Sequence, residues 1–413
     1  MLNQEQAGVV AVINIRNWPR WLVALIYALF GMSLPLMAAI LPEDRADVLY
    51  HSYEGDSVTV DGPSILLRKQ VGKHSSVYAN YYTDSVSSAS IDVRTTASPY
   101  TEEREEKSLG VDLLFDNTNM SLGYTNSEEN DYSSDSYHFG ISHSMLGELT
   151  TVSLGHSYGS DTVRKNQYDA AGNLSGTDPD FGEKSLERRN YRLGISQIVT
   201  KNLIMSLAFE AITDEGYTQN PYRSARIFEQ NPTFRNGVEI PGFVSERYPG
   251  TRTSDTFALR ANYYLPYRAA IRTEFKYFED TWGIKAQTYK IEYTHPLKED
   301  WIIDVRYRLY SQTAASFYKD VFEQGEETLN FRGRDKELSQ FSSQSIGFGF
   351  SYDFMKNGWW HFDKGSLNFA FDRMSFNFDN FTDYDTSEAV NLNLSKPFLF
   401  DGDVVQLYIS VWY

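Results

Sequence analysis

Apolar and polar residues alternate along most of the chain after Leu41, in stretches of about ten residues separated by polar turns. Alternation with period two places successive side chains on opposite faces of a strand. The apolar face is clearest in Val111, Leu113 and Phe115; Met120, Leu122 and Tyr124; Leu203, Met205, Leu207, Phe209 and Ala211; Phe257, Leu259, Ala261 and Tyr263; Ile271, Phe275 and Tyr277; Ile303, Val305, Tyr307 and Leu309. No helical pattern of comparable length competes with this alternation. The sequence therefore predicts an all-β fold.

The connections between these stretches alternate between short and long. Short ones are expected near 72–73, 116–119, 145–148, 200–202, 265–267, 296–300 and 355–364. The longest ones are expected near 164–188, 215–251, 317–340 and 383–396, while 126–132 and 279–283 on the same side look short. Short turns at one end and longer loops at the other are typical of outer-membrane barrels, on the periplasmic and extracellular sides respectively.

The number of short turns predicts the number of strands. Seven turns give seven strand pairs, and a first strand around Asp47–Glu54 with a last one near Phe398–Tyr413 brings the total to about sixteen. If Asp47–Glu54 folds elsewhere, fourteen strands result. We expect residues 40–413 to form a single antiparallel transmembrane β-barrel.

Charged residues occupy the faces opposite to the apolar ones. They are Arg192, Glu210, Arg260, Arg272, Glu274, Lys276, Lys290, Glu292, Asp304, Arg306 and Arg308. A lysine or arginine facing lipid at the bilayer midplane costs about 2–4 kcal/mol, so this face is expected to line a polar lumen. The lumen has three interpretations: an open channel, an interior cross-linked by its own ion pairs, or a barrel plugged by a loop or by residues 43–64.

The N-terminus predicts export. An apolar stretch over residues 21–41 follows Arg16 and Arg20 and ends near the small residues Ala38 and Ala39. This order is typical of a cleaved signal peptide, here residues 1–39, although the stretch is also about long enough for a membrane anchor. The expected location is the outer membrane of a Gram-negative cell.

Composition excludes several classes of function. The chain has 413 residues, no cysteine and a formal charge of −17. The missing cysteines exclude disulfides, thiolate metal sites and Fe–S clusters, and the acidic balance argues against a nucleic-acid partner. The seven histidines show no metal-ligand spacing, so neither a metal nor a cofactor is expected.

The C-terminal residues resemble a signal for barrel assembly. Leu407, Ile409, Val411 and Tyr413 form an alternating apolar face that ends on an aromatic residue. We expect the barrel-assembly machinery to read this segment during insertion, and lipid and lipopolysaccharide to surround the finished barrel. Trp359, Trp360 and Phe362, in one expected periplasmic turn, suit an interfacial aromatic girdle.

Two further strings contain residue types that can carry chemistry. Residues 155–159 read Gly-His-Ser-Tyr-Gly and match the G-x-S-x-G pattern of hydrolases, which requires a sharp strand-to-helix turn. Here the string falls inside an expected strand, and the protein is not expected to be an enzyme. Residues 101–106 form a charge run in an expected external loop, where a solvated surface is the simple reading and cation bridging to lipopolysaccharide the alternative.

Several strings resemble the domain-of-unknown-function 3570 family. They include LPEDRADVLYHSY at 41–53, RRNYRLGISQ at 188–197, RYPGTRT at 247–253 and VVQLYISVWY at the C-terminus. The resemblance implies an outer-membrane barrel of unsettled role. It also implies a genomic neighbourhood of small lipoproteins, flavin-attaching enzymes and thioredoxin-like proteins, and it supplies no catalytic residues. Arginines that fall at the expected outer mouth, as an anion-binding or loop-locking cluster, are Arg223, Arg252, Arg332 and Arg334.

The sequence therefore leaves three candidate functions for the protein. The first is a polar-lumen channel or porin-like conduit. The second is a structural barrel that docks a periplasmic lipoprotein or redox partner of an exported redox system. The third is an outer-membrane hydrolase, which only the Ser157 string supports.

Overall fold

The computed structural model describes residues 41–413 except 56–57, 88–100, 170–173, 229–232, 236–237, 241, 356–357 and 383–395. The expected signal peptide, its anchor alternative and most of the expected loop near 383–396 lie outside the described residues.

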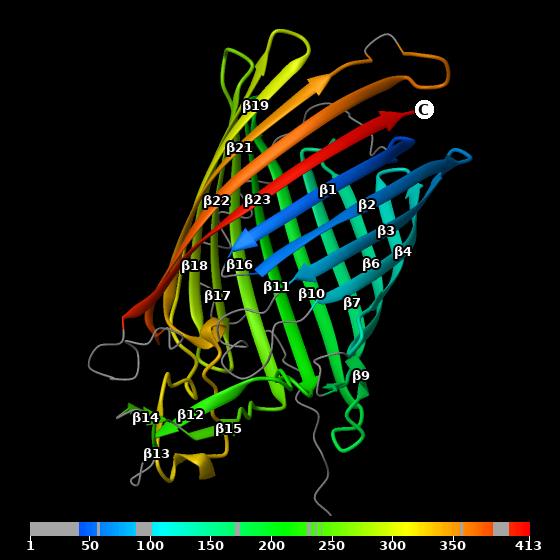
Figure 1. The fold of residues 1–413 in the computed structure, drawn as a ribbon. Helices are drawn as coiled ribbons and strands as arrows, with labels where there is room; N and C mark the ends of the chain where they lie inside the picture. Colours follow the sequence, from blue (N-terminus) through cyan, green and yellow to red (C-terminus); the bar gives the residue numbers. More distant parts are fainter. Residues whose placement is uncertain are drawn as a thin grey trace, which may run out of the picture.

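Sixteen strands form one closed barrel (Figure 1). Their bounds are β1 (Arg45–Gly55), β2 (Val58–Val71), β3 (Ser75–Ser87), β4 (Thr101–Phe115), β5 (Thr118–Glu128), β6 (Tyr132–Met145), β7 (Thr150–Val163), β10 (Lys184–Thr200), β11 (Leu203–Gly216), β16 (Thr251–Tyr264), β17 (Ala270–Asp280), β18 (Lys285–Leu297), β19 (Trp301–Gln312), β21 (Phe341–Asp353), β22 (Lys364–Thr382) and β23 (Pro397–Trp412). Short strands outside the barrel are β8 (Asn166–Tyr168), β9 (Leu174–Thr177), β12 (Ser224–Phe228), β13 (Thr233–Arg235), β14 (Val238–Ile240), β15 (Gly242–Ser245) and β20 (Phe322–Glu323). Two 3-10 turns, η2 (Glu326–Thr328) and η3 (Lys336–Leu338), complete the described elements.

The barrel closes between its first and last strands. β1 pairs antiparallel with β23 from Arg45 opposite Trp412 to Gly55 opposite Gly402, and with β2 on its other edge. Closure pairs the backbone groups of both edges, as a strand wall in lipid requires. The prediction of sixteen strands is confirmed, and the fourteen-strand alternative is wrong. The described part of residues 43–64 belongs to the wall, so this segment does not plug the barrel.

The two ends of the barrel differ as the sequence predicts. The turns at 72–74, 116–117, 146–149, 201–202, 265–269 and 298–300 lie at one end, together with the C-terminus. The long connections at 164–183, 217–250 and 313–340 lie at the other end, where Figure 1 shows β9, β12 and β15 beyond the barrel wall. We call these the turn end and the loop end.

The outer surface of the barrel is apolar and exposed. On β11 the outward side chains include Leu207 at 46% exposure, and on β21 Ile346 at 58%. A continuous belt of such side chains would be costly in water, so it suits a lipid-facing wall. Within the described ranges no helix has the length and apolarity to cross a membrane.

Tyrosines mark the edge of this belt toward the loop end. Tyr50 donates a hydrogen bond to Asp61 at 2.9 Å, and Tyr81 donates to Glu105 at 3.1 Å. Tyr277 makes the same contact with Glu279 at 3.0 Å. An aromatic ring in the apolar zone with its hydroxyl on a carboxylate above it is the arrangement expected at a membrane–water interface.

The charge run at 101–106 corrects one expectation. It is not a loop, because β4 begins at Thr101. Its carboxylates alternate between faces: Glu105 accepts from outward-facing Tyr81 at 3.1 Å, whereas Glu106 accepts from Arg104 at 2.8 Å on the inner face. The run therefore forms the solvent-exposed end of strand β4, which continues into the apolar belt.

Candidate functional site

The interior of the barrel is the candidate site, and it carries ion pairs on more than one side, with Arg68–Asp112 and Arg104–Glu106 on β2–β4. The register places the charged residues singled out in the sequence on the inner face of β10, β11 and β16–β19. We call the inner face of these strands, with that of β21 and β22, the charged wall. Its ion pairs include Arg192–Glu210 (2.6 Å), Arg260–Glu274, Arg272–Glu292 (2.5 Å), Lys290–Glu292 (3.1 Å) and Arg306–Asp372 (2.9 Å), and the Asp304 carboxylate accepts from Thr294 at 2.6 Å.

Glycine makes one of these pairs possible. Arg306 on β19 and Asp372 on β22 are separated by β21, where Gly347 lies between them in register. A Cβ at Gly347 would collide with the Asp372 carboxylate and approach Arg306 Nε to 2.9 Å. The missing side chain therefore lets the ion pair bridge two strands across a third.

Two cations of the charged wall lack such a partner. Neither Lys276 nor Arg308 has a carboxylate within ion-pair distance among the residues that the structure describes. The Glu210 carboxylate interacts electrostatically with Lys276 from beyond ion-pair distance. Its hydrogen bonds come from Arg192 and Asn190. The wall thus presents two cations that form no ion pair with the described carboxylates.

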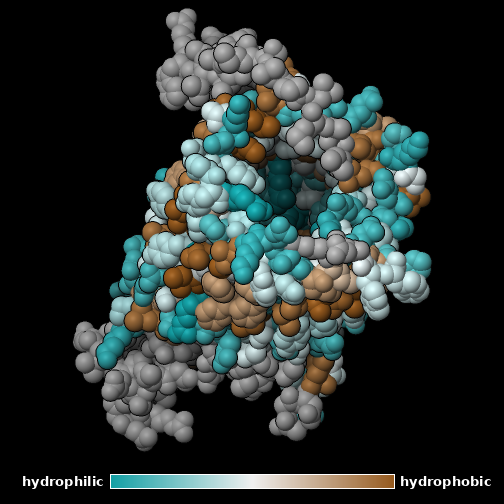
Figure 2. Space-filling view, turned by 90° about the horizontal axis from the view of Figure 1, so that it is seen from above, coloured by the Kyte–Doolittle hydropathy of each residue, from teal (hydrophilic) through white to brown (hydrophobic). Residues whose placement is uncertain are grey.

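Another side of the lumen is built mostly from small residues, with Arg104, Glu106, Asp112, His138 and Asp161 among them. The inner face of β4–β7, here the small-residue wall, carries Ser108, Gly110, Ser121, Gly123, Thr125, Ser134, Ser136, Gly140, Ser142, Ser153, Gly155, Ser157 and Gly159. Tyr78 covers part of it, since a Cβ at Gly110 would meet its ring. Figure 2, viewed from the turn end, shows a hollow lined by hydrophilic residues.

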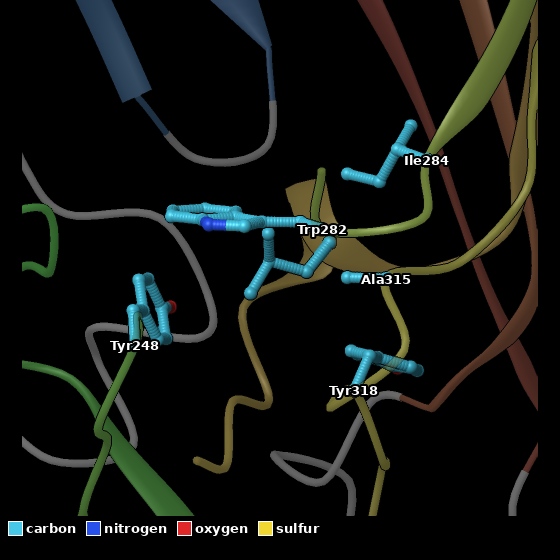
Figure 3. Packing of buried hydrophobic residues seen from close by; sticks show 6 residues of the cluster. Tyr248, Trp282, Ile284, Ala315 and Tyr318 are labelled. Carbon is cyan, nitrogen blue, oxygen red and sulfur yellow. The ribbon is translucent and has the colours of Figure 1, made fainter. Parts of the chain in front are cut away.

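A folded cap stands at the loop end. It consists of residues 217–250 and 313–340, and its core joins Tyr248, Ala315, Tyr318 and Leu338 to the rim residues Trp282 and Ile284 (Figure 3). Trp282 is 4% exposed, donates from Nε1 to the Thr251 carbonyl at 3.0 Å, and packs its ring 5.5 Å from that of Tyr248. The cap therefore has a hydrophobic core of its own, anchored on the barrel rim.

The arginines of the expected outer mouth contact protein groups in and around the cap. Arg223 pairs with Asp335, and Arg252 pairs with Asp280 at 2.7 Å beneath the Trp282 ring. Arg332 donates to the carbonyls of Ser245 and Leu329, at 3.0 and 3.1 Å.

Arg334 lies deepest of the four. It is 4% exposed, pairs with Asp320 at 3.1 Å, and donates to the Thr382 carbonyl at 2.8 Å. Burial raises the pKa of the Asp320 carboxyl above its usual range, although a hydrogen bond from Thr382 and the charge of Arg226 oppose this. This cluster binds residues 313–340, the second cap loop, to the end of β22.

One short segment reaches both sides of the mouth. Tyr222 donates to Asp131 between β5 and β6 and accepts from the Asn166 N–H at 2.7 Å, while Arg226 donates to the Thr382 carbonyl at 3.4 Å. In the barrel order, β6 and β22 are seven strands apart one way round and nine the other. We call residues Tyr222–Arg226 the strap. Their backbone spans at most about 17 Å when extended, and the side chains of Tyr222 and Arg226 add the remaining reach to Asp131 and Thr382. The strap therefore lies across the mouth.

Between the cap and the charged wall lies a cavity of about 720 Å³. Lys276, Arg308 and Tyr310 line it from the barrel, and Tyr248 and Leu338 line it from the cap. The sequence does not predict this chamber, because both cap segments lack strand or helix periodicity and are expected to be loops. The signal that was available is the density of aromatic residues in them, such as Phe317, Tyr318 and Phe322.

The remaining sequence features have clear positions. Ser157 lies within β7 and faces the lumen, so no strand-to-helix turn follows it. Leu407, Ile409 and Val411 lie on the outward face of β23, and the Tyr413 hydroxyl donates to the Arg68 carbonyl at 3.1 Å. Over the part of the chain that the structure describes, no three His, Asp or Glu side chains gather as metal ligands.

Comparison with known proteins gives one family match. The model of the family described as protein of unknown function (DUF3570) matches residues 26–365. No curated protein matches the chain.

Similarity to solved structures is weak. A bacterial polysaccharide outer membrane secretin is 6% identical with a TM-score of 0.48, over 91% of this chain and all of the secretin chain. The siderophore receptor PirA from Acinetobacter baumannii is 9% identical (TM-score 0.42), over 88% of this chain and 57% of the receptor. A mutant of the ferric enterobactin receptor PfeA from Pseudomonas aeruginosa is 10% identical (TM-score 0.42), over 85% and 55%. The chain thus spans little more than half the length of the two receptors, and none of these likenesses identifies a substrate.

Proposed function

We propose that the protein, which belongs to the DUF3570 family of proteins of unknown function, is an outer-membrane conduit with a water-filled lumen and a capped outer mouth. The observation that carries this proposal is the exposure of charged side chains inside the barrel. The Arg192 side chain is 67% exposed and that of Arg272 51%, although both point inward. Charged groups this exposed inside a closed wall require water around them.

The size of the barrel supports the same function. Barrels of sixteen to eighteen strands leave an aqueous channel, whereas eight-stranded barrels are filled by their own side chains. The small-residue wall adds space, because serine and glycine side chains along β4–β7 project little into the lumen. A barrel that served only as a scaffold would gain by filling this space with apolar or paired side chains.

The cap limits the conduit from the outside. The strap lies across the loop end, and the buried arginine cluster locks the cap loops to the rim. We therefore expect passage of small polar solutes and exclusion of large ones in the native protein.

The proposal predicts efflux from vesicles. Liposomes that contain the purified, folded protein should release trapped glucose-sized solutes and retain large dextrans. Ser157→Trp, which places a bulky ring on the small-residue wall, should slow the release. Leu154→Trp, on the outward face of the same strand at 54% exposure, is the matched control and should leave the rate unchanged. Efflux no faster than from protein-free liposomes would contradict the proposal.

A further inference from the structure

The chamber between the cap and the charged wall combines aromatic faces with two cations that form no ion pair within the described part of the chain, and the Arg308 guanidinium lies 5.1 Å from the centre of the Tyr310 ring. Lys276 on β17 is in register with Thr288 on β18, which is in register with Tyr310 on β19. Arg308 is two residues from Tyr310 on the same strand. Neighbouring strands are about 4.8 Å apart and two residues along a strand span about 7 Å, so the Cα atoms of the two cations are separated by roughly 12 Å. Only the short Thr288 side chain lies between Lys276 and Tyr310. Both project into one chamber.

Three of the four carboxylates that line the chamber are already paired with other cations. Glu210 is paired with Arg192 at 2.6 Å, Asp214 with Arg188 at 2.7 Å, and Asp335 with Arg223. Glu337, on the cap, is exposed and faces the same space. A partly enclosed chamber of low dielectric strengthens the attraction of unpaired cations for an anion.

The other feature of the chamber is an aromatic floor. Tyr310 packs on Phe341 at 5.5 Å, and Phe341 on Phe376 at 6.3 Å. Phe376 is stacked on Phe400 at 4.5 Å, with an angle of 8° between the rings. These rings are only half-buried, and Tyr310, Phe341 and Phe376 line the chamber. Half-buried rings fixed by stacking on one another provide a rigid platform for a flat or cyclic ligand.

We propose that this chamber binds ring-bearing organic anions, with the anionic group held by Lys276 and Arg308 and the ring placed on Tyr310, Phe341 and Phe376. The inference rests on the proposed function, because it assigns the conduit a class of solute. The cavity volume of about 720 Å³ falls in the range of small-molecule sites, roughly 300–1,000 Å³. Two sources share this chemistry: sugar acids, whose hydroxyls would suit Thr288 and Glu337, and aromatic acids.

Calorimetric titration of the full-length protein in detergent tests the site. The probes are glucuronate and benzoate, with acetate as an anion without a ring and glucose as a ring without a charge. We expect at least one ring-bearing anion to bind about tenfold more tightly than acetate or glucose. Binding of glucuronate alone identifies the sugar acids, and binding of benzoate alone the aromatic acids. No binding, or equal binding of all four probes, overturns the proposal.

Variants separate the two halves of the site. Lys276→Gln combined with Arg308→Gln should weaken the ring-bearing anion about tenfold. Phe376→Leu should weaken it without changing the affinity for acetate. Arg104→Gln, which removes a lumen cation paired with Glu106 at 2.8 Å on the other side of the barrel, is the matched control. Loss of affinity in the control equal to that in the double variant overturns the assignment.

The titration does not depend on conduction. A protein that binds the ring-bearing anion but releases no solute from liposomes refutes the conduit and leaves the site. A protein that releases solute but binds none of the probes refutes the site and leaves the conduit.

Discussion

Replacement of residues 218–249 by a short glycine–serine turn should raise the conductance of the reconstituted protein several-fold. The removed segment contains the strap, which reaches from Asp131 at one rim to Thr382 at nearly the opposite one. It also supplies Tyr248 to the cap core and Arg223 to the ion pair with Asp335. Without this segment the strap no longer crosses the outer mouth, and residues 313–340 keep their contacts with Trp282, Ile284 and Thr382. The outer mouth therefore widens.

The barrel should tolerate this change. The loop starts and ends at neighbouring positions, because Glu215 pairs with Thr251 and the Gly216 N–H donates to the Gly250 carbonyl at 2.8 Å. A short turn can therefore join β11 to β16 without altering either strand, and surface loops accept such changes well.

Single-channel recording in planar bilayers measures the effect. The matched control shortens the β8–β9 hairpin at residues 168–176, which also lies at the loop end but leaves Asn166 and the strap in place. We expect the control to conduct as the native protein does. A correctly folded variant without residues 218–249 whose conductance is unchanged would show that the strap does not restrict the mouth.

A single arginine on the outer wall should be the most damaging substitution for stability. Leu207 faces outward near the middle of β11 at 46% exposure, and Leu207→Arg should lower the free energy of unfolding by about 2–4 kcal/mol. The cause is the transfer of a guanidinium group into hydrocarbon. The preceding residue, Ser206, faces the lumen and donates to Ser196 at 3.0 Å. Ser206→Arg should cost much less, because its charge reaches water.

Urea titration of both variants in phospholipid vesicles tests this difference. The pair is matched in strand, depth and introduced residue, so that only the face differs. Equal losses of stability, or a greater loss in Ser206→Arg, would mean that the assignment of the two faces is wrong.

The sequence was sufficient for the wall of the barrel because the wall follows a local rule. Period-two alternation fixes the face of each residue, and the turn signals fix the number of strands. The rule also explains why charged residues on different strands, such as Arg272 and Glu292, fall on the same face. The register of β17 and β18 makes these two residues direct neighbours. The charge run at 101–106 was misread because consecutive glutamates are rare in strands. The glutamates are tolerated here because this end of β4 lies beyond the apolar belt and contacts solvent.

The cap and the chamber could not be derived in this way. The strap contact between Tyr222 and Asp131 joins residues 91 apart, and the contact between Arg226 and Thr382 joins residues 156 apart. No periodicity within either segment encodes such pairings, which depend on the closed barrel bringing distant loops to one mouth. The arginines of the mouth could be named from the sequence, whereas their buried partners could not.

Cysteine labelling along β21 tests the central claim most directly, because the chain contains no cysteine of its own. Ser345 faces the lumen beside Arg308, and Ile346 faces outward at 58% exposure. In membrane-reconstituted protein, Ser345→Cys should react with a charged, membrane-impermeant methanethiosulfonate, and Ile346→Cys should be protected by lipid. Protection of Ser345→Cys would mean that the lumen holds no accessible water and would contradict the conduit.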